Sequence, residues 1–167
     1  MKQPEKTKPV IAIALFSFFA VIIIAALLAA WQKARDAIRI SDTKTIRTAL
    51  EIYYNDHSGY PDTGGKGRSE CAQWGNLAAN AVIPDLAPTY TKAIPSDPFM
   101  KKSASDNCYV YVSDGADYAF YDYGSDINFA SEPTFLDPAN DGGRDKCALD
   151  GARYTAWKIS SQGARCW

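Results

Sequence analysis

The sequence has very little histidine and none of the short motifs that commonly mark an enzyme. His57 is the only histidine among 167 residues. The serine-hydrolase elbow, the HExxH zinc motif and the phosphate-binding loop are all absent. His57 stands at the end of a predicted helix, where interaction with the helix dipole explains it better than a role as catalytic base. We therefore predict that this chain is not an enzyme.

Charge is missing from a long stretch near the N-terminus. The 22 residues of Val10–Trp31 contain no Asp, Glu, Lys or Arg. As a helix, this run measures roughly 33 Å, which is enough to cross the hydrocarbon core of a membrane. A cleaved signal has a shorter apolar region followed by a small-residue site, which Ala29-Ala30 resembles. We favour a retained anchor, because the run is long and the helical pattern continues beyond it.

The cysteines lack the CxxC spacing of zinc and redox sites, and all of them follow the apolar run. They are Cys71, Cys108, Cys147 and Cys166. This pattern predicts two disulfides and no zinc site. Three pairings are open, and we expect Cys71–Cys108 with Cys147–Cys166, because neighbours in sequence close the shorter loops. Disulfides need an oxidising compartment, so we expect the N-terminus in the cytoplasm and the cysteine-containing part outside.

An excess of positive charge is also missing from the C-terminal part. Residues 60–167 carry ten Lys and Arg against fourteen Asp and Glu, a net charge of −4. Such a surface repels polyanions, so nothing here indicates a nucleic-acid partner.

The predicted organisation is a cytoplasmic segment (1–9), a transmembrane helix (10–31), an amphipathic continuation (32–59) and an extracytoplasmic globular domain (60–167).

Glycine and proline are absent between Pro9 and Gly59. One continuous helix is therefore predicted, apolar all round in its first half and amphipathic in its second. We expect Gly59 to be the left-handed residue that ends it. Charged residues, Arg39 among them, occupy the other faces. The expected packing stripe consists of Ala34, Ala37, Ile38, Ser41, Thr45, Ala49, Leu50 and Tyr53.

The globular part contains three strand candidates. Cys108–Val112 and Tyr118–Tyr123 are rich in aromatic and β-branched residues and predict a hairpin with a five-residue loop. Arg153–Ser160 is the third candidate, and Leu77–Pro88 is expected to hold a short helix. The predicted fold class is α+β, with a long N-terminal helix packed on a small antiparallel sheet.

A polar stretch near the C-terminus offers oxygen ligands at short offsets around two glycines. Calcium binds such oxygen sets, although the spacing is not that of an EF-hand and Arg144 adds a positive charge. The alternative is a solvated turn, since Asp, Asn and Gly tolerate turn geometry. We favour the turn and keep Ca²⁺ as the one candidate cofactor. The candidate ligands are Asp137, Asn140, Asp141 and Asp145.

The text of residues 34–61 resembles the type IV pilin superfamily, which includes the type II secretion pseudopilins. The similarity lies in Leu50-Glu-Ile-Tyr-Tyr-Asn-Asp56, in Gly59-Tyr60-Pro61 and in the later Ile94-Pro-Ser-Asp-Pro98. It extends over roughly residues 10–125. It implies a pilin-like fold and a structural subunit of a surface or secretion filament. It also implies that membrane lipid holds the chain before assembly, and that an assembly machinery with a separate ATPase builds the filament from copies of the chain.

The apolar run departs from the family pattern at two points. Lys8-Pro9 precedes it where prepilins have a glycine, and the run contains no glutamate. These departures support an alternative function, in which a pilin-like chain stays in the membrane without polymerising and acts as an initiator or as a ligand-binding module.

Overall fold

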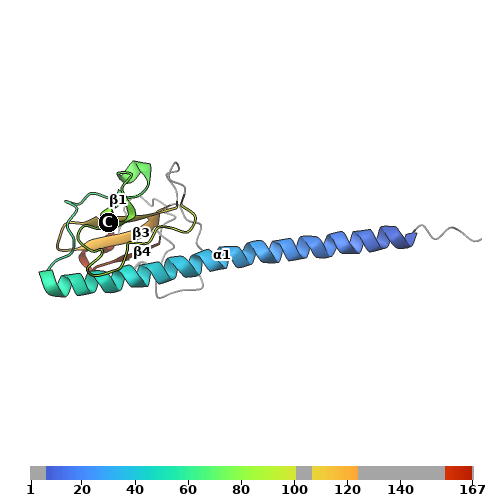
Figure 1. Ribbon diagram of the computed structural model, residues 1–167, viewed down its shortest axis with the longest axis horizontal. Helices are drawn as coiled ribbons and strands as arrows, with labels where there is room; N and C mark the ends of the chain where they lie inside the picture. The colour runs from blue at the N-terminus through green and yellow to red at the C-terminus, as the bar shows by residue number, and fades with distance from the viewer. Residues whose placement is uncertain (1–6, 101–106, 124–156, 167) are drawn as a thin grey trace, which may run out of the picture. The chain divides into compact units, whose positions relative to one another are not determined.

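The computed structural model describes residues 7–100, 107–123 and 157–166 (Figure 1). It divides into two compact units, Met1–Ala37 and Ile38–Trp167. The fold class is α+β, as predicted: a long N-terminal helix is followed by a small antiparallel sheet. The elements are α1 (Thr7–His57), β1 (Arg68–Ser69), β2 (Cys108–Ser113), β3 (Tyr118–Tyr123) and β4 (Trp157–Ser160), with 3-10 turns at Ala72–Trp74, Ala79–Ala81 and Gly163–Cys166.

Helix α1 ends at His57, where the sequence predicts its end, but the residue that ends it differs from the prediction. Ser58, and not Gly59, adopts the left-handed conformation, with φ 56°. The Ser58 amide donates to the Tyr54 carbonyl at 2.7 Å, which closes the last turn. Gly59 is required for another reason, because a Cβ there would lie 2.9 Å from the carbonyl oxygen of Gly115. The chain leaves the helix through this close contact.

The part of α1 within the second unit buries a stripe that the sequence pattern did not predict. Arg39, Thr43, Ile46 and Leu50 are all buried, at alternating spacings of four and three residues. Of the predicted stripe, only Ala49, Leu50 and Tyr53 lie on the packed side. The prediction failed because the stripe begins with two polar residues. The exposed members of the predicted stripe are Ala34, Ala37, Ile38, Ser41 and Thr45.

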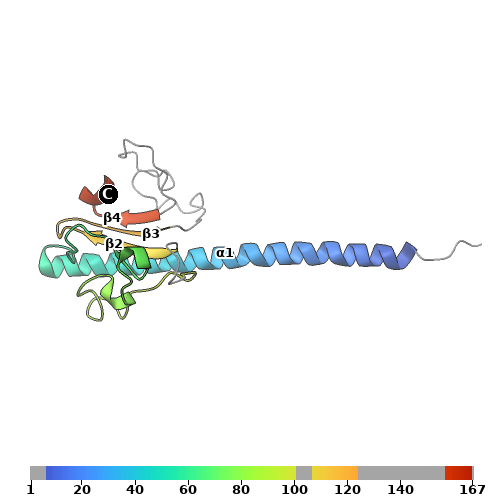
Figure 2. The same cartoon turned by 90° about the horizontal axis from the view of Figure 1, so that it is seen from above.

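The four strands form one antiparallel sheet in the order β1-β2-β3-β4. Figure 2 shows β2, β3 and β4 in this order. The predicted hairpin is confirmed, with Cys108 opposite Tyr123 and Ser113 opposite Tyr118. Ser113 extends β2 by one residue, so the loop has four residues and not five. The third predicted strand is confirmed over Trp157–Ser160, which pairs with β3. Strand β1 is new, because two residues within a turn-rich stretch carry no strand pattern.

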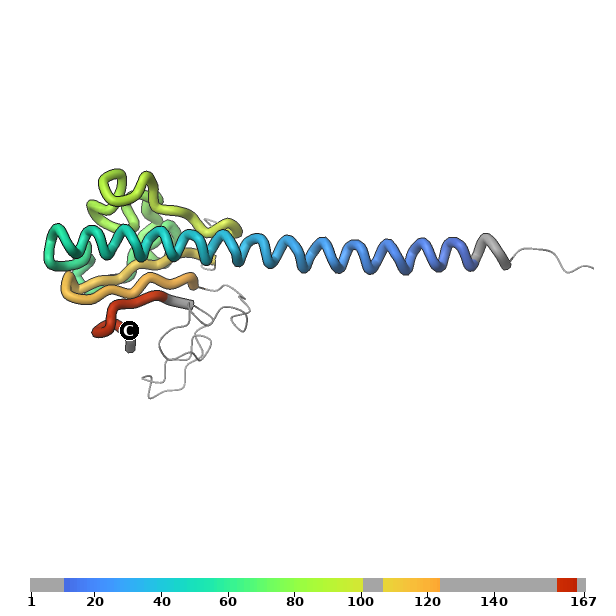
Figure 3. Tube along the Cα trace, turned by 90° about the horizontal axis from the view of Figure 1, so that it is seen from below, coloured from blue at the N-terminus to red at the C-terminus, as the bar shows by residue number. Residues whose placement is uncertain are grey.

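The last turns of α1 lie along one face of this sheet (Figure 3). That face contributes aromatic side chains from β2 and β3, and the connecting segment between β1 and β2 closes the core from the side. The expected helix over Leu77–Pro88 is wrong, since only a 3-10 turn at Ala79–Ala81 forms there. The core consists of Ile46, Ala49, Leu50, Val82, Ile83, Leu86, Ile94, Tyr109, Tyr111, Tyr118, Phe120 and Ile159.

Candidate functional site

The first candidate site is the apolar surface of α1 in the first unit. Its large apolar side chains from Ile11 to Trp31 are exposed by between 47% and 78%. They lie on all sides of the helix, since none of its most apolar stretch is buried within the chain. A soluble domain does not leave so much contiguous apolar surface in water. This helix is long and apolar enough to span a membrane.

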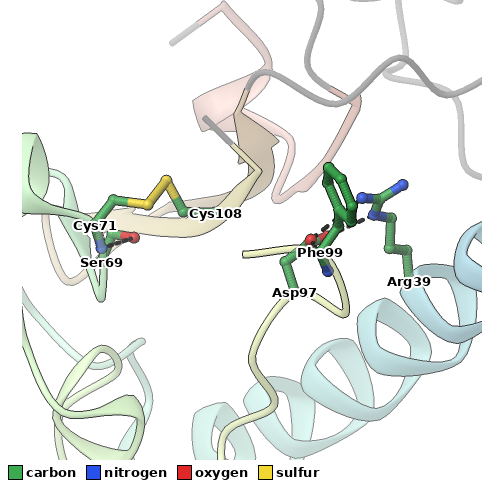
Figure 4. The surroundings of a disulfide bond; sticks show 6 residues. All are labelled: Arg39, Ser69, Cys71, Asp97, Phe99 and Cys108. Carbon is green, nitrogen blue, oxygen red and sulfur yellow. Dashed lines mark hydrogen bonds and ion pairs between the residues drawn. A yellow bond between two sulfur atoms is a disulfide. The ribbon is translucent and has the colours of Figure 1, made fainter. Parts of the chain in front are cut away.

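The second candidate site is a buried ion cluster around Arg39, within the second unit. The Arg39 guanidinium leaves α1 and meets Asp97 of the connecting segment (Figure 4). Its Nε donates to Asp97 Oδ2 at 2.5 Å, and its Nη2 donates to Asp97 Oδ1 at 3.2 Å. Its Nε also lies 3.1 Å from Asp122 Oδ2 on β3. One cation therefore joins three elements of the fold inside the protein.

Each partner of Arg39 is held in place by its local structure. The amide of Phe99 donates to Asp97 Oδ1 at 2.7 Å, in a turn that aims the carboxylate at the helix. Asp122 follows Tyr118 and Phe120 at alternating positions of β3, so it lies on the face that packs against α1. Asn107 accepts a longer bond, 3.4 Å, from Arg39 Nη2. The planar fork of arginine suits this set of acceptors, which a lysine could not bind in the same way.

A carboxylate of α1, Asp42, lies beside this cluster. The Tyr109 hydroxyl donates to Asp42 Oδ2 at 2.9 Å. Partial burial raises the pKa of Asp42, the bond from Tyr109 opposes that rise, and the negative charge of Asp97 adds to it. Burial also raises the pKa of Tyr109, and the Asp42 charge reinforces the effect. The tyrosine therefore stays neutral and serves as a hydrogen-bond donor between sheet and helix.

His57 is held at the end of α1 by two tyrosines. Its ring stacks on Tyr53 with centroids 4.1 Å apart, and its Nε2 lies 2.9 Å from the Tyr90 hydroxyl. The Tyr90 hydroxyl donates its proton to Asp56 Oδ2 at 3.1 Å. Nε2 must therefore carry a hydrogen and donate to Tyr90. These contacts join the helix end to the connecting segment.

The Cys71–Cys108 disulfide that the sequence predicts is present, and it joins the segment just after β1 to the first residue of β2 (Figure 4). Both cysteines are fully buried. Cys147 lies outside the described residues, so nothing tests the second expected disulfide, Cys147–Cys166. The candidate calcium ligands also lie outside the described residues: Asp137, Asn140, Asp141 and Asp145. Within the described ranges, no group of three or more His, Cys, Asp or Glu side chains is placed to hold a metal ion.

The sequence reasoning missed the Arg39 cluster, although part of its signal is visible. Asp122 lies two residues after Phe120 and four after Tyr118, so its side chain is on the same, inward face of the strand. Arg39 lies seven residues before Ile46, on the same side of the helix. Nothing in the text connects either residue to Asp97, since 58 positions separate Arg39 from Asp97. Only the folded chain brings these groups together.

Three features of the geometry bear on function: the exposed apolar helix, the ion cluster that ties α1 to the sheet, and the buried disulfide. Comparisons of this chain with protein-family models, with curated proteins and with solved structures found no match.

Proposed function

We propose that this chain is a membrane-anchored structural subunit that assembles into a pilin-like filament through its N-terminal helix. The observation that carries the proposal is the apolar surface of α1, which is exposed on all sides from Ile11 to Trp31. Apolar surface of this extent needs a cover other than water. Lipid supplies the cover before assembly, and the same helices of neighbouring copies supply it afterwards.

The composition of the apolar run suits both environments. Its length matches the hydrocarbon core of a membrane. Small residues recur along it and permit close approach of another helix, as in packing between transmembrane helices. Extraction from lipid is unfavourable unless helix packing replaces the lost contacts, so an assembly machinery with its own ATPase would drive the step. The small residues are Ala12, Ala14, Ser17, Ala20, Ala25, Ala26, Ala29 and Ala30.

The disulfide of the globular domain supports an orientation with the N-terminus inside and this domain outside. The Cys71–Cys108 disulfide fits an oxidising compartment for the domain that contains it. The Arg39 cluster and the disulfide brace that domain at two separate places. A braced domain suits a filament subunit, which must stay folded while its helix moves from lipid into a polymer.

A second candidate function is a pilin-like anchor that does not polymerise. The observation that favours it is the absence of glutamate from the apolar run. Such a chain would keep the same fold and orientation, and its helix would stay in lipid. The two candidates differ in one measurable property, the presence of the chain in material sheared from the cell surface.

A matched pair of variants tests the filament proposal. Ala26→Leu keeps the helix apolar but adds bulk where a neighbouring helix must approach, whereas Ile24→Leu conserves volume. We expect both variants in the membrane fraction, and we expect only Ala26→Leu to lower the amount of chain that pellets with sheared surface filaments. If the wild-type chain never enters the sheared pellet, the filament proposal is wrong and the anchor remains.

A further inference from the structure

Three side chains of different chemistry meet at the end of α1: an imidazole, a phenol and a carboxylate. The His57 Nε2 atom lies 2.9 Å from the Tyr90 hydroxyl oxygen, and the same oxygen lies 3.1 Å from Asp56 Oδ2. Asp56 and His57 are exposed and Tyr90 is half-buried, so the three groups can be reached from solvent. These residues are called the helix-end cluster below.

The two distances in the helix-end cluster match the separation of neighbouring ligands on one metal ion. Imidazole nitrogen and side-chain oxygen bind a divalent transition metal at about 2.0–2.2 Å. Two such ligands at a right angle are about 3.0 Å apart, whereas two at the tetrahedral angle are about 3.4 Å apart. The observed 2.9 Å and 3.1 Å fit the right angles of a tetragonal site. Cu²⁺ prefers this geometry when its ligands are nitrogen and oxygen.

The packed part of the fold holds the cluster in place. The His57 ring stacks on Tyr53 with centroids 4.1 Å apart, and Tyr53 also meets the Tyr90 ring edge-on at 5.1 Å. The Tyr90 amide donates at 2.9 Å to the carbonyl of Leu86, a fully buried core residue. A metal ion therefore meets side chains that are already ordered, so little conformational entropy is lost on binding.

The charge around the cluster favours a cation. The C-terminal end of a helix carries a partial negative charge, and Asp56 and His57 lie in the last turn of α1. The Asp56 carboxylate adds its own negative charge. Burial raises the pKa of the adjacent Tyr53, and the negative charge of Asp85 adds to this rise. A second carboxylate, Asp85, therefore contributes to the negative potential at these rings.

We infer that His57, Tyr90 and Asp56 form a binding site for a divalent transition metal ion, and that Cu²⁺ is bound more tightly than Zn²⁺. On binding, the His57 proton moves from Nε2 to Nδ1, so that the Nε2 lone pair faces the metal. The Tyr90 phenol releases its proton to solvent and binds as the phenolate. One Asp56 oxygen supplies the third bond, and water completes the coordination. The site joins the end of α1 to the connecting segment and does not depend on the proposed filament.

Titration of the metal-free full chain with Cu²⁺, in detergent and without a histidine tag, tests the site. Binding is followed by the phenolate-to-copper charge-transfer absorption and by the melting temperature, which rises when a ligand binds only the folded state. His57→Gln keeps an amide that can donate to Tyr90 but removes the imidazole, and Tyr90→Phe removes the phenol. Glu51→Gln, at an exposed carboxylate elsewhere on α1, is the matched control.

We expect Cu²⁺ to stabilise the wild type and Glu51→Gln equally, and to bind His57→Gln and Tyr90→Phe at least tenfold more weakly. Tyr90→Phe should also lose the charge-transfer band. Unchanged Cu²⁺ affinity in His57→Gln would overturn the site, as would tighter binding of Zn²⁺ than of Cu²⁺. The melting temperature without metal verifies that each variant folds.

Electron paramagnetic resonance of Cu²⁺ on the wild-type chain decides the matter without any variant. Because His57 is the only histidine, coupling of the copper to one imidazole nitrogen identifies it as a ligand. We expect this coupling, and a spectrum with oxygen ligands alone would overturn the site. None of these readouts involves filaments, so the metal site and the filament proposal can fail separately.

Discussion

Arg39 and Asp97 stand 58 residues apart in the sequence and form a buried, two-point ion pair, in which Arg39 Nε and Nη2 lie 2.5 Å and 3.2 Å from the two carboxylate oxygens. Each residue is 5% exposed. Removal of one partner of a buried ion pair strongly destabilises a fold, because the other charge is left buried and uncompensated. The pair thus fixes the position at which α1 meets the connecting segment, and it makes that contact sensitive to single substitutions.

Removal of one member of this pair should destabilise the globular unit. We expect Asp97→Asn and Arg39→Met each to lower the free energy of unfolding by about 3–5 kcal/mol. Thermal unfolding of the full chain in detergent, followed by circular dichroism, measures the effect. Lys66→Met, at an exposed position, is the control and should change stability by less than about 0.5 kcal/mol. Equal melting temperatures for Asp97→Asn and Lys66→Met would contradict a structural role for the cluster.

Substitution of the neighbouring carboxylate should have the opposite sign. The raised pKa of Asp42 means that the folded chain holds this proton more tightly than the unfolded chain does. The resulting stability is present below the ordinary value of 3.8 and is lost as the pH rises through the folded-state pKa. Asp42→Asn keeps an acceptor for Tyr109 without this loss. We expect it to match the wild type in acid and to equal or exceed it at pH 7, measured by denaturant unfolding.

The sequence reveals the parts of the fold that follow from local patterns, but it does not reveal contacts between residues far apart in the chain, such as Arg39 and Asp97. The helix, its end at His57, the hairpin and the Cys71–Cys108 disulfide follow from local patterns, and the structure confirms them. The packed stripe of α1 was mispredicted because hydropathy favours Ile38 over Arg39, whereas the fold buries Arg39 with two carboxylates. Pairing across 58 residues leaves no periodic trace, so the ion cluster could not be found without the structure.

Loss of the disulfide should destabilise the same unit by a different route. Cys71 and Cys108 enclose a loop with a sequence separation of 37. Their crosslink restricts the unfolded chain, and its removal costs about 3–4 kcal/mol at this loop length. The double variant Cys71→Ala with Cys108→Ala isolates this bond from the other two cysteines. A melting temperature unchanged from the wild type would show that the bond adds nothing to stability.

Alkaline titration should distinguish buried from exposed tyrosines. Burial raises the pKa of Tyr60 to about 12 and raises the pKa values of Tyr109, Tyr111 and Tyr118 further. These groups are neutral in the folded chain and ionise near pH 10 when it unfolds. Stability is therefore fully present below pH 10 and falls as the pH rises through 12. Absorbance at about 295 nm should show a delayed fraction of tyrosines, and titration of every tyrosine near pH 10 in the folded chain would contradict their burial.

The junction after α1 offers a matched pair of neighbouring substitutions. Gly59→Ala places a methyl group 2.9 Å from the Gly115 carbonyl oxygen. We expect it to lower the free energy of unfolding by about 1–3 kcal/mol. Ser58→Gly removes a side chain from a left-handed position with φ 56°. We expect it to raise the free energy of unfolding by about 0.5–1 kcal/mol. Chemical denaturation of both variants measures the difference. The same sign of change in both would refute this account of the junction.

Immunogold electron microscopy of material sheared from producing cells, with antibody against residues 60–167, tests the central claim most directly. Cells that lack the chain provide the control. A subunit that exchanges lipid for neighbouring helices should appear as regular labelling along filaments. Labelling confined to membrane fragments, in preparations that contain unlabelled filaments, would contradict the claim and leave α1 as a membrane anchor alone.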